Sequence, residues 1–381
     1  MRVLVVSHMY PRNETDSLGI FVREQVEALA LVADVTVVVG RYGEARKATV
    51  VAPGRPRVIE VPLPLRRGLP SAVRIVTAIG PYFREALRVA HESGPYDVVH
   101  AHYGVPDGVV GIRLSSALGI PVVVTLHGSD ANRQFLVPVL GTVFARWVAQ
   151  ADAIIGVSEA IATGMRHAHP KARHRVLHLP NGYNCADIHV HAERSPRYLL
   201  FVGRLSPRKN PDVLLDAFAR IAGSTTLSLV FVGDGPMAAS LAKQARDLGI
   251  ADRVRFEGSR AHRALDAYLA DAAALVLPSK SEGMPMVINE ALASGTPVVA
   301  SRLPGIEQQV RSDEWGILVI PGDVDDLANA LGKAITRHWD YARIAADCGV
   351  PSWDDYATQL LAVYCSVIRD SGSTCRTVTV G

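Results

Sequence analysis

The stretch LPSKSEGMPMVINEALASGTPVV, residues 277–299, predicts a complete strand–helix–strand unit. A strand ends at Pro278, and Pro285 suits the first residue of a helix because the N–H that proline lacks would be unpaired there. Gly295 ends this helix, since glycine readily adopts the left-handed conformation that closes helices, and Pro297 opens the next strand. Such a unit is the repeating element of a parallel sheet covered by helices.

Similar units extend in both directions along the chain, where short apolar runs alternate with amphipathic stretches. Expected strands form a first series at 3–7, 35–39, 98–102, 122–126 and 153–157, and a second at 198–202, 227–232, 254–257, 274–277, 298–300 and 317–319. The fold class is therefore α/β with two doubly wound sheets. We expect domains at 1–190 and 191–352, a C-terminal helix at 353–369 and a loose tail at 370–381.

Composition agrees with this organisation. The chain has 381 residues, enough for two domains, and its 49% apolar and 20% charged residues are typical of a globular protein. A net charge of +3 is too small to make nucleic acid the expected partner. The four cysteines form no C-x-x-C pair, and no signal-peptide core or long apolar run occurs, so reduced thiols and a cytoplasmic location are expected.

Two loops at predicted strand ends carry residues suited to phosphate and hydroxyl groups. A free helix N-terminus beside Gly283 favours phosphate, while Glu282 and Glu290 can accept hydrogen bonds from different hydroxyls of one ligand. The loop GRLSPRK, residues 203–209, places Arg204 and Lys209 where they can neutralise phosphate oxygens. Taken separately, solvated surface acids and a solvated basic loop would explain each feature as well.

Taken together, these residues resemble glycosyltransferase family 4. Glu282 and Glu290 resemble the E-x7-E signature of this retaining family, and residues 203–209 are similar to its G-R-L-x-x-x-K loop. Further matching segments are TLHGSD at 125–130, PNG at 180–182, VGDGP at 232–236, GILV at 316–319 and GD at 322–323. The resemblance is dense over residues 198–330 and thinner over the first domain.

The resemblance implies the GT-B fold, in which two Rossmann-like domains face each other across a cleft and the last helix crosses back to the first. The donor, a nucleotide sugar, would lie mainly on the second domain. Glu282 would bind hydroxyls of the donor sugar and Glu290 the ribose, while Arg204 and Lys209 would hold the diphosphate. The implied donor site comprises Gly19, Gly203, Arg204, Lys209, Gly258, Ser259, Arg260, Glu282, Gly283, Met284, Pro285 and Glu290.

The acceptor would lie mainly on the first domain by the same resemblance. His127 follows a predicted strand and would contact the transferred sugar, so that it joins Glu282, Arg204 and Lys209 as a catalytic residue. Gly19 matches the family's first strand-to-helix loop, although this chain has one glycine where many members have two adjacent ones. Candidate acceptor-binding residues are His102, Tyr103, Asp130 and Asn181.

The expected chemistry follows from charge. Departure of the nucleoside diphosphate creates negative charge that the site must stabilise. Arg204, Lys209 and the helix N-terminus at Gly283 would do so, and no D-x-D triplet is assigned to a divalent ion, so no metal or other cofactor is expected. The acceptor hydroxyl would attack on the face that the leaving phosphate departs from. The prediction is a retaining hexosyltransferase acting on a glycolipid, polysaccharide precursor or small molecule.

Three alternatives fit parts of the sequence. Gly233-x-Gly235-x-x-Ala238 follows a predicted strand and Glu257 ends the next, which imitates the NAD-binding fingerprint of an oxidoreductase. A non-catalytic homologue that binds sugar nucleotides would retain the donor residues. The H-x-H pair at 100 and 102 could bind a metal, but the other interpretation is two histidines in the core or lining the cleft.

Residues 41–90 are strongly basic, with ten Lys or Arg against three Glu. Apolar residues intersperse them, and Pro81 is expected to divide the segment into two short helices and a loop. Such a surface suits peripheral contact with an anionic membrane, which would place the enzyme at the inner face of that membrane. The alternative is a solvated Arg-rich surface and a soluble acceptor.

Overall fold

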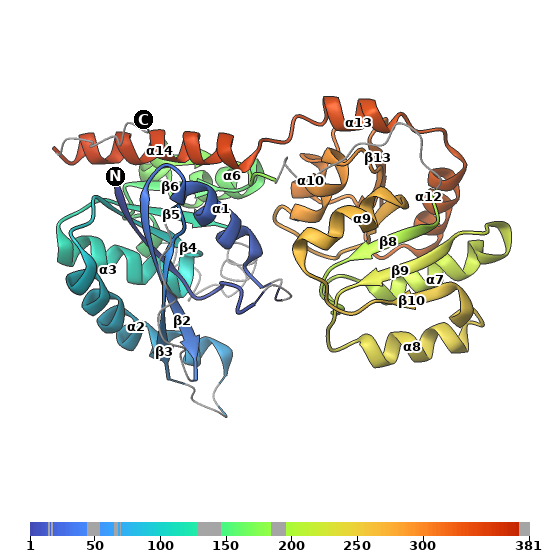
Figure 1. Ribbon diagram of the computed structural model, residues 1–381, viewed down its shortest axis with the longest axis horizontal. Helices are drawn as coiled ribbons and strands as arrows, with labels where there is room; N and C mark the ends of the chain where they lie inside the picture. Colours follow the sequence, from blue (N-terminus) through green and yellow to red (C-terminus); the bar gives the residue numbers. More distant parts are fainter. Residues whose placement is uncertain are drawn as a thin grey trace. The chain divides into compact units, whose positions relative to one another are not determined.

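The computed structural model describes residues 1–13, 16, 18–43, 54–64, 68, 70–128, 146–183 and 196–372 (Figure 1). The chain divides into two compact units. The first comprises Met1–Pro11, Leu18–Asn181 and Trp353–Gly381, and the second comprises Arg12–Ser17 and Gly182–Ser352.

The first unit contains a sheet of seven strands in the order β3-β2-β1-β4-β5-β6-β7, and every neighbouring pair is parallel. The strands are β1 Arg2–Ser7, β2 Asp34–Tyr42, β3 Arg57–Leu63, β4 Val98–His102, β5 Val122–Leu126, β6 Ala153–Gly156 and β7 Val176–His178. Its α-helices are α1 Ile20–Ala30, α2 Ser71–Ser93, α3 Val109–Leu118, α6 Glu159–Ala168 and α14 Trp353–Asp370. The strand order reverses between β1 and β4.

The second unit repeats this plan with six parallel strands in the order β10-β9-β8-β11-β12-β13. They are β8 Tyr198–Val202, β9 Ser228–Val232, β10 Val254–Phe256, β11 Ala272–Leu277, β12 Val298–Ser301 and β13 Gly316–Val319. The helices are α7 Pro211–Ile221, α8 Ala238–Asp247, α9 Leu265–Ala270, α10 Met286–Ala293, α11 Pro304–Glu307, α12 Val324–Thr336 and α13 Tyr341–Asp347. Two doubly wound parallel sheets confirm the predicted fold class.

The predicted strands all occur, within a few residues at their ends, but the sequence analysis missed β3 and β7. Both lie at an edge of the first sheet. β3 has the sequence RVIEVPL, whose charged residues and Pro62 weaken the apolar signal, and an edge strand tolerates proline because one side of its backbone needs no partner. β7 has only three residues, too few to show alternation.

Two predictions about proline were wrong. Pro285 is the N-cap of α10 rather than its first residue, since its ψ of 117° is extended and the helix begins at Met286. Pro81 does not divide α2, which is continuous from Ser71 to Ser93. Ala78, Tyr82 and Ala86 are fully buried on α2, so tertiary packing offsets the hydrogen bond that Pro81 cannot make. Gly295, with φ of 79°, does end α10 as expected.

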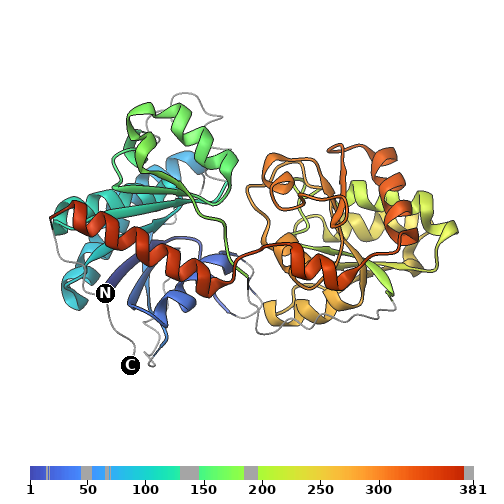
Figure 2. The ribbon, with the colours of Figure 1, turned by 90° about the horizontal axis from the view of Figure 1, so that it is seen from above.

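Helix α14 belongs to the first unit although the whole second unit precedes it in the chain. It lies alongside α1 (Figures 1 and 2). The indole Nε1 of Trp353 donates to the buried carboxylate of Glu24 at 2.8 Å. Further along the helix, Tyr364 Oη lies 2.6 Å from His100 Nδ1, and His100 Nε2 lies 2.8 Å from Thr125 Oγ1. These bonds join α14 to β4 and β5.

The cysteines depart from expectation at one position. Cys348 is a free, buried thiol, whereas Cys365 is disulfide-bonded, so the prediction of reduced thiols is wrong there. Within the part of the chain that the structure describes, no helix has the length and apolar character needed to cross a membrane.

Buried histidines make the stability of the first unit pH-dependent. Burial lowers the pKa of His100 and of His127 to about 3 and that of His102 well below its usual value. The folded unit keeps these rings neutral, whereas the unfolded chain protonates them below about pH 6.5. Their contribution is present above pH 6.5 and is lost as pH falls, by about 1.4 kcal/mol per pH unit and ring.

The free energy of unfolding should rise with pH between about pH 4 and 6.5. We expect this slope to be smaller in His100→Asn, by the contribution of one proton that the unfolded chain binds and the folded chain does not. Urea denaturation at several pH values, followed by tryptophan fluorescence, measures this slope. The exposed His91 on α2 provides the control His91→Asn. An unchanged slope in His100→Asn would contradict the prediction, even if the variant is less stable overall.

Candidate functional site

The order of strands in the second unit reverses between β8 and β11, and open parallel sheets bind ligands at the carboxyl edge of such a switch point. Among the loops that leave the sheet at this edge are 203–209 after β8, 257–260 after β10 and 278–285 after β11. These loops contain most of the residues that the sequence analysis assigned to the donor.

The loop after β8 is held by its neighbour after β9. Gly203 N donates to Val232 O at 2.9 Å, and Leu205 N donates to Asp234 O at 3.0 Å. Both contacts require glycine opposite, because a Cβ on Gly233 would lie 2.0 Å from Gly203 O, and one on Gly235 would lie 2.3 Å from Leu205 O. The glycines of the supposed NAD fingerprint thus serve the packing of two loops.

The loop after β10 joins the same group. Gly233 N donates to Gly258 O at 2.9 Å, which places Gly258 beside the loop after β9. Ser259 and Arg260 are exposed, and Arg260 is oriented by hydrogen bonds to Glu257 at 2.8 Å and to the Tyr268 hydroxyl at 3.3 Å. A nucleobase near this loop would meet both backbone groups and an oriented guanidinium.

An ion pair links the loops after β8 and β11. Lys209 Nζ lies 2.7 Å from Glu282 Oε1, and both side chains are largely buried, with exposed fractions of 12% and 6%. Arg208 is 3.7 Å from the same carboxylate, and Lys280 N donates to Arg208 O at 2.8 Å. Arg204 is exposed just beyond the end of β8. The structure therefore places the cations that the resemblance assigns to phosphate next to the carboxylate that it assigns to sugar hydroxyls.

Helix α10 begins at this carboxyl edge with Pro285 as its N-cap, and the first N–H groups of a helix lack the usual partner four residues earlier. The loop that leads into α10 contains Gly283 and Met284, and the segment with Gly305 and Gln309 packs closely against it. A Cβ on Gly305 would lie 1.7 Å from Gly283 O, and Gln309 Nε2 donates to Pro285 O at 3.0 Å. This support fixes the start of α10 next to Glu282.

Glu290 lies on α10 and is buried. Its Oε1 is 2.9 Å from His262 Nε2, a residue of the short turn that precedes α9. The sequence analysis did not identify His262, and no local signal marks it, because its role depends on a contact 28 positions away. His262 constrains the carboxylate that the family resemblance assigns to ribose.

The remaining predicted residues lie in the first unit, at the carboxyl edge of its sheet. His127 Nε2 is 3.0 Å from His102 Nδ1, and the His127 ring is 4.5 Å from that of Phe21 and 4.9 Å from that of Tyr103, between centroids. Gly19, with φ of 74°, precedes α1, and a Cβ there would lie 2.3 Å from Met9 O.

The two further acceptor candidates are Asn181 and Asp130. Asn181 is buried at the end of the segment 18–181. Asp130 lies outside the described residues. His100 and His102 are fully buried, and His100 bonds Tyr364 and Thr125, which supports the core interpretation of the H-x-H pair.

Acidic residues that could suggest a metal have other partners. The sequence analysis overlooked a D-x-D triplet when it expected none to hold a divalent ion, because Asp323-Val324-Asp325 forms one at the start of α12. Asp323 Oδ1 caps that helix by accepting from Asp326 N at 3.0 Å, and Asp325 is ion-paired with Arg220. Among the residues described, no three His, Cys, Asp or Glu side chains gather in a metal-binding arrangement.

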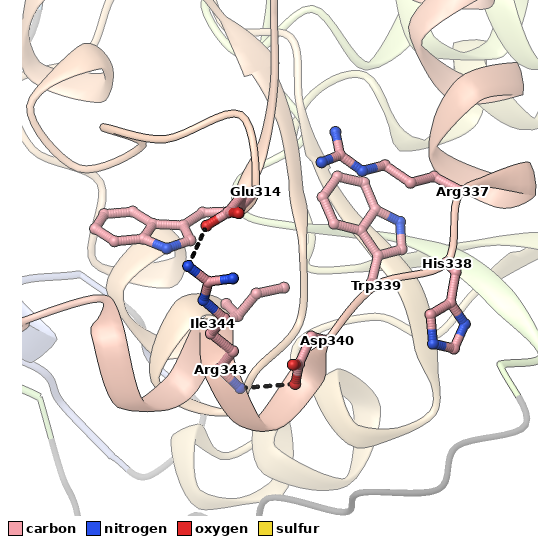
Figure 3. A pocket seen from close by; sticks show the side chains of 8 residues that line it. Glu314, Arg337, His338, Trp339, Asp340, Arg343 and Ile344 are labelled. Carbon is pink, nitrogen blue, oxygen red and sulfur yellow. Dashed lines mark hydrogen bonds and ion pairs between the residues drawn. The ribbon is translucent and has the colours of Figure 1, made fainter.

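A separate cavity of about 110 Å³ in the second unit is lined by residues of the segments 314–315 and 337–344 (Figure 3). Arg337 covers the face of Trp339 at 4.5 Å from the ring centroid, and Arg343 is 3.2 Å from Glu314. The charged groups of this cavity thus interact with one another, and it contains none of the predicted donor residues.

Sheet order and site chemistry define the class of the protein, a GT-B glycosyltransferase. The chain belongs to glycosyltransferase family 4, whose family model matches residues 18–187, while the model of glycosyl transferases group 1 matches residues 187–346. It is an enzyme of the hexosyltransferase class. The oxidoreductase interpretation is therefore wrong.

Sequence relatives include D-inositol 3-phosphate glycosyltransferases. Those of Mycolicibacterium paratuberculosis and Actinosynnema mirum are 32% and 33% identical, over 74% and 72% of this chain and 69% and 73% of theirs. Sucrose-phosphate synthase from Thermosynechococcus elongatus has a TM-score of 0.78 at 23% identity, covering 97% of this chain and 100% of that one. HepE from Anabaena in complex with UDP has a TM-score of 0.68 at 21% identity, covering 98% and 100%.

Proposed function

We propose that the enzyme transfers a sugar from a nucleoside-diphosphate sugar to a polyol or sugar hydroxyl, with retention of anomeric configuration and without a metal. The Lys209–Glu282 pair at 2.7 Å carries this proposal, because it places a phosphate-binding cation beside a hydroxyl-binding carboxylate at the switch point. A nucleotide sugar is the ligand that presents phosphate and sugar hydroxyls at that spacing.

The family resemblance supports the detailed roles. The diphosphate interacts with Arg204 and Lys209, the ribose with Glu290, and the sugar hydroxyls with Glu282. When the donor binds, Lys209 gains a phosphate oxygen as a partner and Glu282 gains a sugar hydroxyl. Both partners belong to one ligand, so the two side chains stay close together. HepE, which has the same fold, is found in complex with UDP-glucose, so this nucleotide sugar is the natural first donor to test.

Metal independence rests on the positive charge that the protein itself provides. Arg204, Arg208 and Lys209 all lie on the loop after β8, and the N-terminus of α10 adds its partial positive charge. Preorganised charges of this kind stabilise a departing diphosphate without reorganising during the reaction.

The step itself involves one bond exchange. The acceptor oxygen forms a bond to the anomeric carbon on the face from which the phosphate leaves. The bond between that carbon and the phosphate oxygen breaks, its electron pair stays on the phosphate, and the phosphate takes the acceptor proton. His127 contacts the sugar and stays neutral, because burial lowers its pKa to about 3.

We infer that the acceptor is a polyol, in line with the name D-inositol 3-phosphate glycosyltransferase of the curated relatives. The described part of the basic segment supports a soluble acceptor, because Arg41 pairs with Glu60 at 2.7 Å and Arg88 with Glu92 at 2.8 Å. Val73 and Val76, exposed on α2, are the features that favour a membrane surface instead.

Variants of the proposed donor site test whether its charged side chains are needed for turnover. We expect Glu290→Ala, Glu282→Ala and Arg204→Ala each to lower turnover by about two to three orders of magnitude, because each removes a charged partner of the donor. Release of UDP from UDP-glucose measures turnover. Lys243→Ala on α8, which removes an exposed cation paired with Asp247, is the control and should retain wild-type activity. Wild-type rates in all three site variants would disprove the assignment.

Stereochemistry and chelation test the mechanism. Proton NMR of the product formed from UDP-glucose should show the α-anomeric coupling of the donor, and a chelator should leave the initial rate unchanged. An inverted product would contradict the front-face step, and loss of activity that manganese restores would contradict metal independence. Release of UDP also distinguishes the enzyme from a non-catalytic sugar-nucleotide-binding protein.

Binding to lipid vesicles distinguishes a soluble acceptor from a lipid-linked acceptor at a membrane surface. We expect no co-sedimentation with either anionic or neutral vesicles at low salt, since ion pairs already occupy several arginines of the basic segment. Binding to anionic vesicles that weakens as salt rises would contradict this and favour a lipid-linked acceptor. In that case Val73→Ser with Val76→Ser should reduce it.

A further inference from the structure

A buried histidine–carboxylate pair lies at the switch point of the first sheet and has no part in the donor chemistry. His8 directly follows β1, and Asp107 lies in the turn Gly104–Gly108 after β4, the neighbouring strand at which the order reverses. His8 Nδ1 and Asp107 Oδ2 are 2.5 Å apart. Asp107 is fully buried, while the His8 side chain keeps 20% of its surface exposed.

Several elements enclose the carboxylate. Tyr82 of α2 is fully buried, and its hydroxyl donates to Val38 O at 3.0 Å and accepts from Gly40 N at 3.2 Å. Tyr42, at the end of β2, is close enough to Asp107 and Arg74 for both to affect its pKa, although burial is the main cause of its rise. Burial likewise raises the pKa of Asp107, and His8 opposes that rise.

Ring contacts connect the pair to His127, the residue that the family resemblance assigns to the transferred sugar. The rings of His8 and Tyr103 meet edge to face at 5.4 Å between centroids, and Tyr103 contacts the ring of His127 at 4.9 Å. Tyr103 has φ of 74°, a conformation that costs a non-glycine residue about 1 to 3 kcal/mol. The surrounding structure maintains this strained conformation. As a result, the Tyr103 ring lies between the rings of His8 and His127.

A buried carboxylate that hydrogen-bonds one nitrogen of a histidine fixes the orientation and tautomer of the ring. Only the part of the pair that belongs to His8 reaches the surface, so a ligand at this edge meets the imidazole and not Asp107. Imidazole nitrogen exchanges hydrogen bonds with hydroxyl groups, which polyols carry on adjacent carbons.

We propose that His8 binds a hydroxyl of the polyol acceptor, next to the position of the transferred sugar, and that Asp107 is its positioning residue. The proposal rests on the proposed function and adds to it an acceptor-binding residue that neither the motifs nor the family resemblance supplied. His8 takes no proton in the transfer step. Its hydrogen bond to the acceptor determines which acceptors the enzyme uses and how tightly it binds them.

The matched variants His8→Gln and His8→Asn test this directly. The Gln amide reaches the position of Nε2, on the side away from Asp107, whereas the Asn amide reaches that of Nδ1 and can keep the bond to Asp107. We expect His8→Asn to raise the acceptor KM about tenfold or more and His8→Gln to raise it less. Asp107→Asn should raise it to an intermediate degree.

The assay uses UDP-glucose with glycerol, myo-inositol and D-inositol 3-phosphate, and takes the polyol that the wild-type enzyme glycosylates best. Hydrolysis of UDP-glucose without acceptor should stay within about twofold of wild type in all three variants. His178→Ala is the control, since His178 also pairs with a carboxylate, 3.5 Å from Glu159, at the far edge of the sheet on β7.

Other outcomes overturn the proposal. The pair would have only a structural role if the acceptor KM were lower for His8→Asn than for His8→Gln. The same conclusion would follow if UDP-glucose hydrolysis fell in parallel, or if both variants failed to fold. If the wild-type enzyme hydrolyses UDP-glucose but uses none of the polyols, the acceptor inference fails while the donor assignment stands. If it neither hydrolyses nor transfers, the proposed function itself fails.

Discussion

Every strand of both sheets runs parallel to its neighbours, so the carboxyl ends of each sheet emerge along one edge. This constraint brings residues together that are far apart in the sequence. In the second unit it places the loops after β10, β9, β8 and β11 in a row, and the Lys209–Glu282 pair joins the last two at 2.7 Å. In the first unit the same geometry gathers His8, Tyr103 and His127 at one edge.

Glycine makes this convergence possible at the tightest points. Gly233 and Gly235 approach the backbone of the neighbouring loop more closely than any side chain would permit, and Gly305 does the same beneath Gly283. Backbone contacts thus hold these loops in addition to the Lys209–Glu282 pair. Arg204, which takes no part in that pair, is not the main support of its loop.

The sequence predicted what depends on local patterns. Apolar runs of three to six residues identified most strands of both sheets, and the segment with Glu282 and Glu290 was correctly predicted to follow a strand and lead into a helix. The two edge strands of the first sheet were missed because β3 contains charged residues and proline, and β7 is short. His262 and the His8–Asp107 pair were missed for another reason. Their significance lies in contacts 28 and 99 positions apart, and no local period or motif encodes them.

The docking of α14 has a consequence for how the chain is made. The bond between Trp353 and Glu24 closes 329 positions of sequence, and α14 covers a surface of the first unit. During synthesis the ribosome delivers β1 to β7 before the second unit and α14 after it, so the side of α1 that α14 covers stays uncovered while the second unit emerges. Synthesis at about 5 to 20 residues per second makes this interval on the order of ten seconds or longer. The first unit therefore completes its packing only after the second unit has been synthesised.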